Sequence, residues 1–187
     1  MTLGDIKEST LTLIEEYNPD IAKNFTDDED LGVKMNGSVN RVMFELSRIK
    51  KIPKYIKLEN VSAGDVVDFN TLSKKCGYEI YQVSLITGVQ YEARADGTIF
   101  KMLEGGDAEI DVYVYPEQIT KKTSNSYELE LSADVLEIMP YGVAADILST
   151  DVSSNYKEFK QRYETMLSRL DTRNKIPTVQ IVGGYNI

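Results

Sequence analysis

The chain has 187 residues, a length typical of one domain with at most a small inserted lobe. It holds 30 Asp and Glu against 21 Lys and Arg, a formal net charge of -9, which argues against wrapping nucleic acid or lying on an anionic membrane. It contains no histidine and a single cysteine, Cys76, for which we expect a packing role. This composition excludes histidine-based catalysis, zinc clusters and an intrachain disulfide.

Two helices are predicted before residue 53, because apolar side chains recur there at steps of three and four. Asn18 and Pro19 should end the first helix, and Pro53 the second. The acidic segment 27–30 lacks the ligand spacing of an EF-hand loop, so we expect it to cap the second helix rather than bind calcium. The two apolar stripes are Leu3, Ile6, Thr10, Leu13 and Tyr17, then Leu31, Met35, Val39, Val42, Leu46 and Ile49.

Between about residues 55 and 131 the apolar period changes to two, which indicates β structure. Asp96-Gly97 predicts a tight hairpin, because Gly adopts positive φ without steric cost and Asp tolerates it. In the strand before Pro116, alternation should turn Tyr113 and Tyr115 outward and three aliphatic residues, Ile110, Val112 and Val114, inward. The predicted strands cover 78–86, 89–93, 98–103, 108–115 and 127–131.

After residue 131 the helical period returns. We expect one helix capped by Ser132 and kinked at Pro140 and Gly142, followed by a last helix from Asn155. Their apolar positions are Leu136, Met139, Val143, Ile147 and Leu148, then Tyr156, Phe159, Tyr163, Met166, Leu167 and Leu170.

These elements together predict an α+β fold. Two N-terminal and two C-terminal helices should pack as a four-helix base, from which an antiparallel β lobe is inserted. The expected divisions are 1–53 and 132–174 for the base, 54–131 for the lobe and 175–187 for an extended tail. The tail contains the β-forming run TVQIV, which would add a strand either to its own sheet or to a neighbouring subunit.

No catalytic, cofactor-binding or metal-ligating residues are predicted. The glycine pairs at 105–106 and 183–184 fit no phosphate-binding loop, so we expect no cofactor. An enzyme would depend on an unrecognised pair of carboxylates, and we expect the chain not to be one. The basic group Arg48, Lys50, Lys51 and Lys54 is expected to be a solvated helix end.

Several segments resemble the head-to-tail connector proteins of tailed bacteriophages and prophages. The first is DDEDLGVKMNGSVNRVMFELSRIKKIPKYI, an acidic cap and helix with a basic end. The second is YELELSADVLEIMPYGVAADILSTDVSSNYKEFKQRYETMLSRLD, in which a polar strand leads into two helices. Between them, CGYEIYQVSL and the strand ending at Tyr115-Pro116-Glu117 are also similar to this family.

The resemblance implies a structural virion protein of the adaptor class. Such a protein forms a ring, typically of twelve copies, beneath the portal protein at the neck of the virion, and it would be made in the bacterial cytoplasm. Its expected partners are the portal, neighbouring copies and the next neck or tail-completion protein. DNA would pass through an acidic lumen without specific binding, and no membrane partner is expected.

Two groups of residues follow as candidate interfaces. Small side chains allow close helix approach, so a packing seam is expected at Gly142, Ala144, Ala145 and Tyr163. Contacts with the portal or a neighbouring subunit are expected from the tail, at Val179, Gln180, Ile181, Val182, Tyr185 and Ile187. The alternatives are a stopper or tail-completion protein, or a β-lobe module that binds carbohydrate through Tyr113 and Tyr115.

Overall fold

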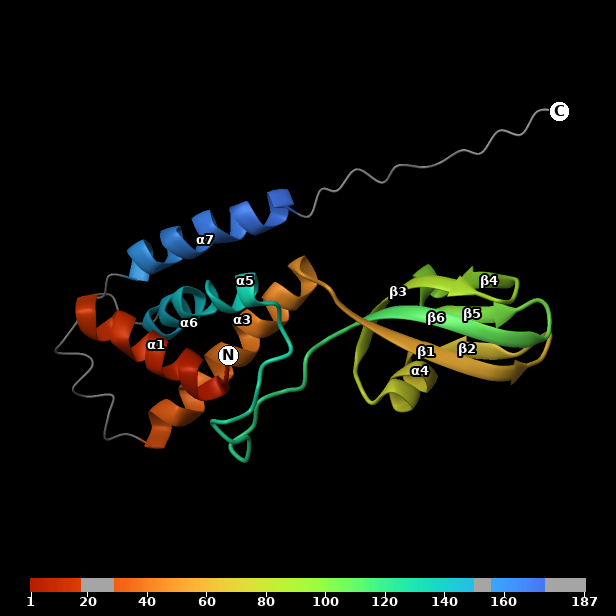
Figure 1. The fold of residues 1–187 in the computed structure, drawn as a ribbon, viewed down its shortest axis with the longest axis horizontal. Coiled ribbons are helices and arrows are strands. Elements are labelled where there is room, and N and C mark those ends of the chain that lie inside the picture. The colour runs from red at the N-terminus through yellow and green to blue at the C-terminus, as the bar shows by residue number, and fades with distance from the viewer. Residues whose placement is uncertain (18–28, 150–155, 174–187) are drawn as a thin grey trace.

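The computed structural model describes residues 1–17, 29–149 and 156–173, and it confirms the α+β fold class. A helical base and a β lobe lie end to end, and the chain crosses between them twice (Figure 1). The base contains α1 (Leu3–Tyr17), α3 (Glu29–Ile49), α5 (Ala133–Leu136), α6 (Met139–Leu148) and α7 (Tyr156–Arg173). The helices of the base therefore come from both sides of the lobe in sequence.

Helix α6 lies at the centre of the base and contacts α1, α3 and α7. Its side chains are apolar on most sides, which is the pattern of a helix buried among others. The predicted stripes supply the surrounding core, including Leu3 and Ile6 of α1 and Val39, Val42 and Leu46 of α3, all buried. Buried positions in α6 are Met139, Pro140, Gly142, Val143, Ala144, Ala145 and Leu148.

The lobe is built from strands and one short helix. Its elements are β1 (Ile52–Val61), β2 (Val66–Asp68), α4 (Phe69–Cys76), β3 (Ile80–Thr87), β4 (Tyr91–Arg94), β5 (Ile99–Met102) and β6 (Gly106–Val114). Within the described residues these strands form two three-stranded antiparallel sheets, in the orders β1-β6-β3 and β2-β5-β4. Ile110, Val112 and Val114 of β6 are fully buried, as predicted.

The predicted hairpin at Asp96-Gly97 is present between β4 and β5. Asp96 and Gly97 have φ values of 56° and 80°, the left-handed conformation that such a turn requires. Pro53, expected to follow the helix as a stop, lies instead inside β1, opposite Tyr113. Because β1 is at the edge of its sheet, the missing N–H of the proline is tolerated there.

The predicted strand at 127–131 is wrong. This segment is extended, but its backbone pairs with the N-terminus instead of a sheet: Leu3 N–H donates to the carbonyl of Tyr127 at 2.8 Å. Ile119 and Leu129 belong to the core of the base. The buried amide of Asn40 holds Ile119 on both sides, donating to its carbonyl and accepting from its N–H, each at 2.8 Å. The named strands of the lobe therefore lie within 52–114.

Helical structure after residue 131 also differs from the single kinked helix expected. The chain breaks at 137–138 into α5 and α6. Pro140 then falls in the first turn of α6, where its missing N–H costs nothing, and Gly142 lies inside a continuous helix. The short helix α4 was not predicted. The tail 175–187 and residues 27–28 lie outside the described parts of the chain.

Candidate functional site

A groove with a volume of about 460 Å³ runs between α7 and the pair α3 and α6. Three of the four residues of the predicted seam, Gly142, Ala145 and Tyr163, line it. A Cβ atom added at Gly142 would lie 2.7 Å from Cε2 of Tyr163, so the ring rests directly on the glycine. Ala144 is also buried, but in a separate cluster with Ile14 and other residues of α1, α6 and α7.

The Tyr163 hydroxyl joins α7 to α3 by donating a hydrogen bond to Oε2 of Glu45 at 3.0 Å. Burial of the ring raises the pKa of Tyr163 far above its usual range, and the Glu45 carboxylate raises it further. The phenol therefore remains a hydrogen-bond donor over the whole physiological pH range. It fixes the last described helix on the base.

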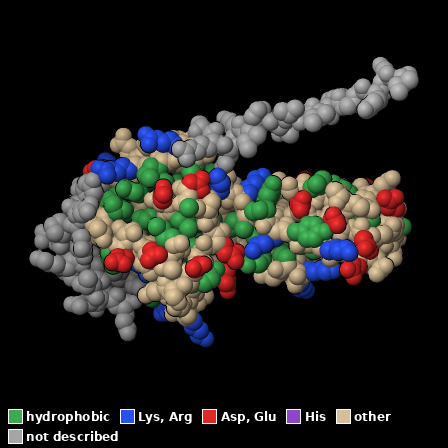
Figure 2. Space-filling view, in the orientation of Figure 1, with side chains coloured by type: hydrophobic (Ala, Val, Ile, Leu, Met, Phe, Trp, Pro, Cys, Tyr) green, Lys and Arg blue, Asp and Glu red, His purple; other side chains and the backbone are tan. Residues whose placement is uncertain are grey.

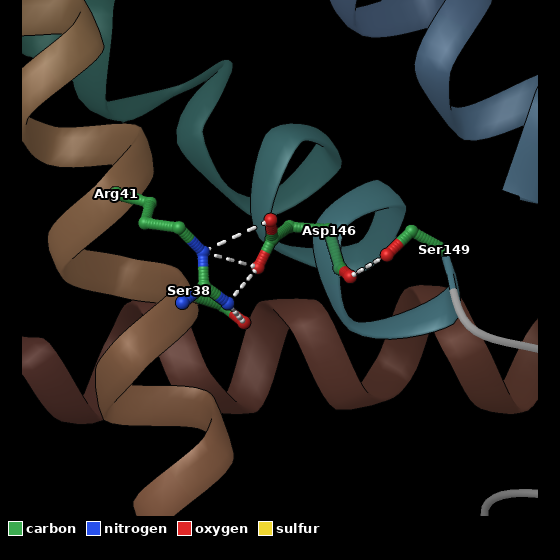
Figure 3. A network of polar contacts seen from close by, with 4 residues as sticks. All are labelled: Ser38, Arg41, Asp146 and Ser149. Carbon is green, nitrogen blue, oxygen red and sulfur yellow. Dashed lines mark hydrogen bonds and ion pairs between the residues drawn. The ribbon is translucent and has the colours of Figure 1, made fainter.

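A second polar link connects α3 to α6 at the rim of the same groove (Figure 3). Arg41 Nε donates to both carboxylate oxygens of Asp146 at 3.1 Å, and Nη2 donates to Asp146 and to Ser38. Ser149 donates to the backbone carbonyl of Asp146 at 2.7 Å. Burial would raise the pKa of Asp146, but hydrogen bonds from Arg41 and Ser38 outweigh it and lower the pKa overall. The carboxylate is thus kept ionised and neutralised by Arg41.

The connection between base and lobe contains three cation–aromatic contacts. The charged groups of Arg48, Lys51 and Lys54 lie 5.4, 4.4 and 4.2 Å from the ring centroids of Tyr115, Tyr113 and Tyr78, respectively. Such contacts contribute about 0.5–1 kcal/mol each at exposed sites. The basic group is therefore part of the junction rather than only a solvated helix end.

Tyr115 is the central ring of this junction. It packs edge-on against Phe44 of α3 at 5.5 Å and lies 4.8 Å from the ring of Tyr81 in β3. Arg48 Nε donates to its hydroxyl at 3.0 Å. Tyr115 is therefore half-buried between base and lobe. Strand alternation predicted an outward ring, but this ring is occupied by contacts within the protein itself.

A hollow of about 440 Å³ opens beside Tyr115 at the junction. Its lining combines aromatic and acidic side chains: Phe44, Tyr78, Glu79, Tyr115 and Glu117, with Gly77, Pro116 and Gln118. The hydroxyl of Tyr127 donates to Glu117 at 3.4 Å. Burial, together with Glu117 and Glu130, raises the pKa of Tyr127 to about 12.

Sequence reasoning missed Arg41, Glu45 and Asp146 in the groove and Glu79 and Glu117 in the hollow. Each lies on a helix or loop where a charged residue is ordinary, and each meets its neighbours only through long-range packing. The portal-contact candidates Val179, Gln180, Ile181, Val182, Tyr185 and Ile187 lie outside the described residues. No pattern of local spacing marks the groove or the hollow.

The described residues contain no group of three or more Asp, Glu, Cys or His arranged to hold a metal ion. None of the helices in these parts of the chain has both the length and the apolar content that crossing a bilayer requires. The groove and the hollow thus present packing, charge and aromatic surfaces rather than a metal centre. No protein-family model matches the chain, and no curated protein matches it either.

Proposed function

We propose that the chain is a structural virion protein, a head-to-tail connector of the adaptor class that forms a ring beneath the portal. The observation that supports this most is the architecture: helices from both sides of the lobe in sequence form one base, and a β lobe projects from it (Figure 1). Connector proteins of the family that the sequence resembles are helical bundles, some of which have a β insert. The function follows from that resemblance and this architecture together.

The junction suits a subunit that holds two partners in a fixed relative orientation. Arg48 and Tyr115, with the rings of Phe44 and Tyr81, tie α3 to the β1-β6-β3 sheet. A lobe fixed in this way keeps its orientation relative to the base. In the proposed ring, the base would contact the portal and the lobes would reach toward the next neck protein.

The outer surface of the lobe offers contacts for neighbouring copies. Tyr55 of β1 and Leu85 of β3 are 57% and 51% exposed, and both pair with Asp111 of β6, so they flank one rung of the same sheet. Apolar side chains interrupt the polar surface of the lobe in Figure 2. Exposed apolar side chains of this kind are buried when subunits associate.

The charge balance is compatible with a conduit for DNA. A net charge of -9 repels phosphate, so a ring of such subunits would let a genome pass without holding it. We propose that the tail residues Val179 to Val182, with Tyr185 and Ile187, add a strand to the portal or to the adjacent copy.

Sedimentation of the purified chain, alone and with the portal protein of the same genome, followed by electron microscopy, tests the proposal. We expect a ring seated on the portal, and loss of that ring for Leu85→Asp. The control Val66→Asp, which alters a similarly exposed residue on the other sheet, should leave the ring intact. Truncation at Pro177 should abolish docking and leave the base and lobe folded. A chain that does not bind the portal but binds a later neck protein would instead be a stopper or tail-completion protein.

A further inference from the structure

The hollow at the junction has aromatic walls and an acidic rim. Phe44, Tyr78 and Tyr115 supply rings, and Glu79 and Glu117 supply carboxylates. The N–H of Tyr115 donates to the backbone carbonyl of Glu79 at 2.8 Å, which places Glu79 beside Tyr115. Glu79 and Glu117, both exposed, thus line the same hollow as the three aromatic residues.

These two carboxylates differ from their neighbours in lacking a cation. Lys54 lies 3.5 Å from Glu130, and Lys50 lies 3.0 Å from Asp134, so both of those acids are paired. Glu79 and Glu117 form no ion pair within the described residues, and Glu117 accepts only the long hydrogen bond from Tyr127. Among the described residues, these two carboxylates of the hollow therefore have no ion-pair partner, although Arg48 contacts the ring of Tyr115 beside them.

We propose that this hollow binds a basic side chain, an arginine, presented by a partner protein. A guanidinium group stacks on aromatic rings and donates forked hydrogen bonds to carboxylates, so it satisfies both features of the site at once. An anion would be repelled by Glu79 and Glu117, and an apolar group would leave their charges without a partner. Only the identity of the partner, a neighbouring copy or a neck protein, rests on the proposed function.

The hollow lies at the junction, where such a contact would involve both the base and the lobe. Phe44 belongs to α3 of the base, whereas Tyr78 and Glu79 lie between α4 and β3 of the lobe. A bound guanidinium would thus touch base and lobe together. Its binding would add a third cation to those of Arg48 on Tyr115 and Lys54 on Tyr78.

An NMR titration with N-acetyl-arginine amide tests the site without any partner protein. We expect saturable shifts of the backbone amides at 77–79 and 115, 117 and 118, whereas N-acetyl-citrulline amide, a neutral analogue of similar shape, should leave them unchanged. Glu79→Gln combined with Glu117→Gln should weaken binding at least about fivefold, the range of one to two exposed charge contacts. Glu128→Gln, an exposed change in the extended segment outside the hollow, should leave affinity unaltered.

Equal shifts with arginine and citrulline amides, shifts confined to other surfaces, or unchanged affinity in the double variant would each overturn the proposal. Urea unfolding of the double variant establishes that its fold is intact before the titration is compared. These results are independent of sedimentation with the portal. A failed titration therefore removes the arginine site and leaves the ring to be judged separately.

Discussion

Replacing Gly142 by alanine should destabilise the base, although alanine is the better helix former. The new Cβ would lie 2.7 and 3.0 Å from two atoms of the Tyr163 ring and 3.0 Å from Cγ1 of Val42. The ring has little room to retreat, because it is 7% exposed and its hydroxyl is bonded to Glu45. Overpacking of this kind costs about 1–3 kcal/mol, whereas helix propensity returns about 1 kcal/mol.

The expected net loss is about 1 kcal/mol in the free energy of unfolding, measured by urea denaturation. Gly37→Ala is the matched control, because it is also helical and its added Cβ would meet only Arg41 Nη1, at 3.6 Å. That variant should gain up to about 1 kcal/mol. Equal effects of the two substitutions would refute close packing at Gly142.

A double-mutant cycle isolates the contact itself. Tyr163→Ala alone should cost about 3–5 kcal/mol, as truncation of a buried ring does. Gly142→Ala made in that background no longer meets the ring, so the two losses should sum to at least about 1 kcal/mol more than the double variant shows. Strict additivity would mean that the Tyr163 ring is not the obstacle.

Three further predictions concern other parts of the molecule. Gly88→Ala should destabilise the lobe by more than about 2 kcal/mol, because φ is 87° and a Cβ would lie 2.2 Å from the Asp107 carbonyl oxygen. The control Gly64→Ala, at a φ of 96° but with open space around the Cβ, should cost only about 1 kcal/mol in the same urea assay. Equal losses for the two variants would contradict the clash at Gly88. Asp146→Asn should reduce the loss of folding stability at acid pH. The folded pKa of Asp146 is lowered, so the stabilisation that it provides is full above about pH 4 and is lost as the pH falls through the folded pKa. Urea midpoints measured between about pH 5 and pH 2 would follow this loss. An unchanged loss of stability at acid pH would count against the ion pair with Arg41. Tyr115→Leu should leave base and lobe folded but widen the distribution of angles between them. Because the two bodies lie end to end, bending should give a smaller radius of gyration in X-ray scattering, and an unaltered scattering curve would show that other contacts fix the angle.

The helices and the hairpin could be predicted because their patterns are local. The stripe containing Val39, Val42 and Leu46 repeats with the period of a helix, and the positive φ at Asp96 and Gly97 requires the residue types found there. These features depend on a few adjacent residues. Tertiary packing then only selects what the local sequence already favours.

The extended segment after the lobe shows why other elements were misassigned. Tyr127 and Leu129 alternate as in a strand, but alternation does not identify the partner of an extended chain. The partners here are the N-terminal residues and, for Ile119, the amide of Asn40 in a distant helix. No spacing within the segment records contacts that span so much of the sequence.

Helix α4 is a different case, because its end signals are present in the sequence. Asp68 accepts a hydrogen bond from Thr71 N–H at 2.7 Å, and Gly77 adopts a φ of 79° just after the helix. An apolar stripe of only eight residues was too short to distinguish from the surrounding strands. The groove and the hollow had no such signals, since their charged residues meet only through long-range packing of helices and loops.

The two crossings between lobe and base determine how the molecule responds to tension. Ile52 and Val114 are paired, so β1 and β6 leave the sheet at the same rung. A force that draws the base away from the lobe pulls both strands in one direction and does not shear the hydrogen bonds between them. The backbone thus connects the two bodies by a double tether, which still holds them together after the packed interface at the junction has yielded.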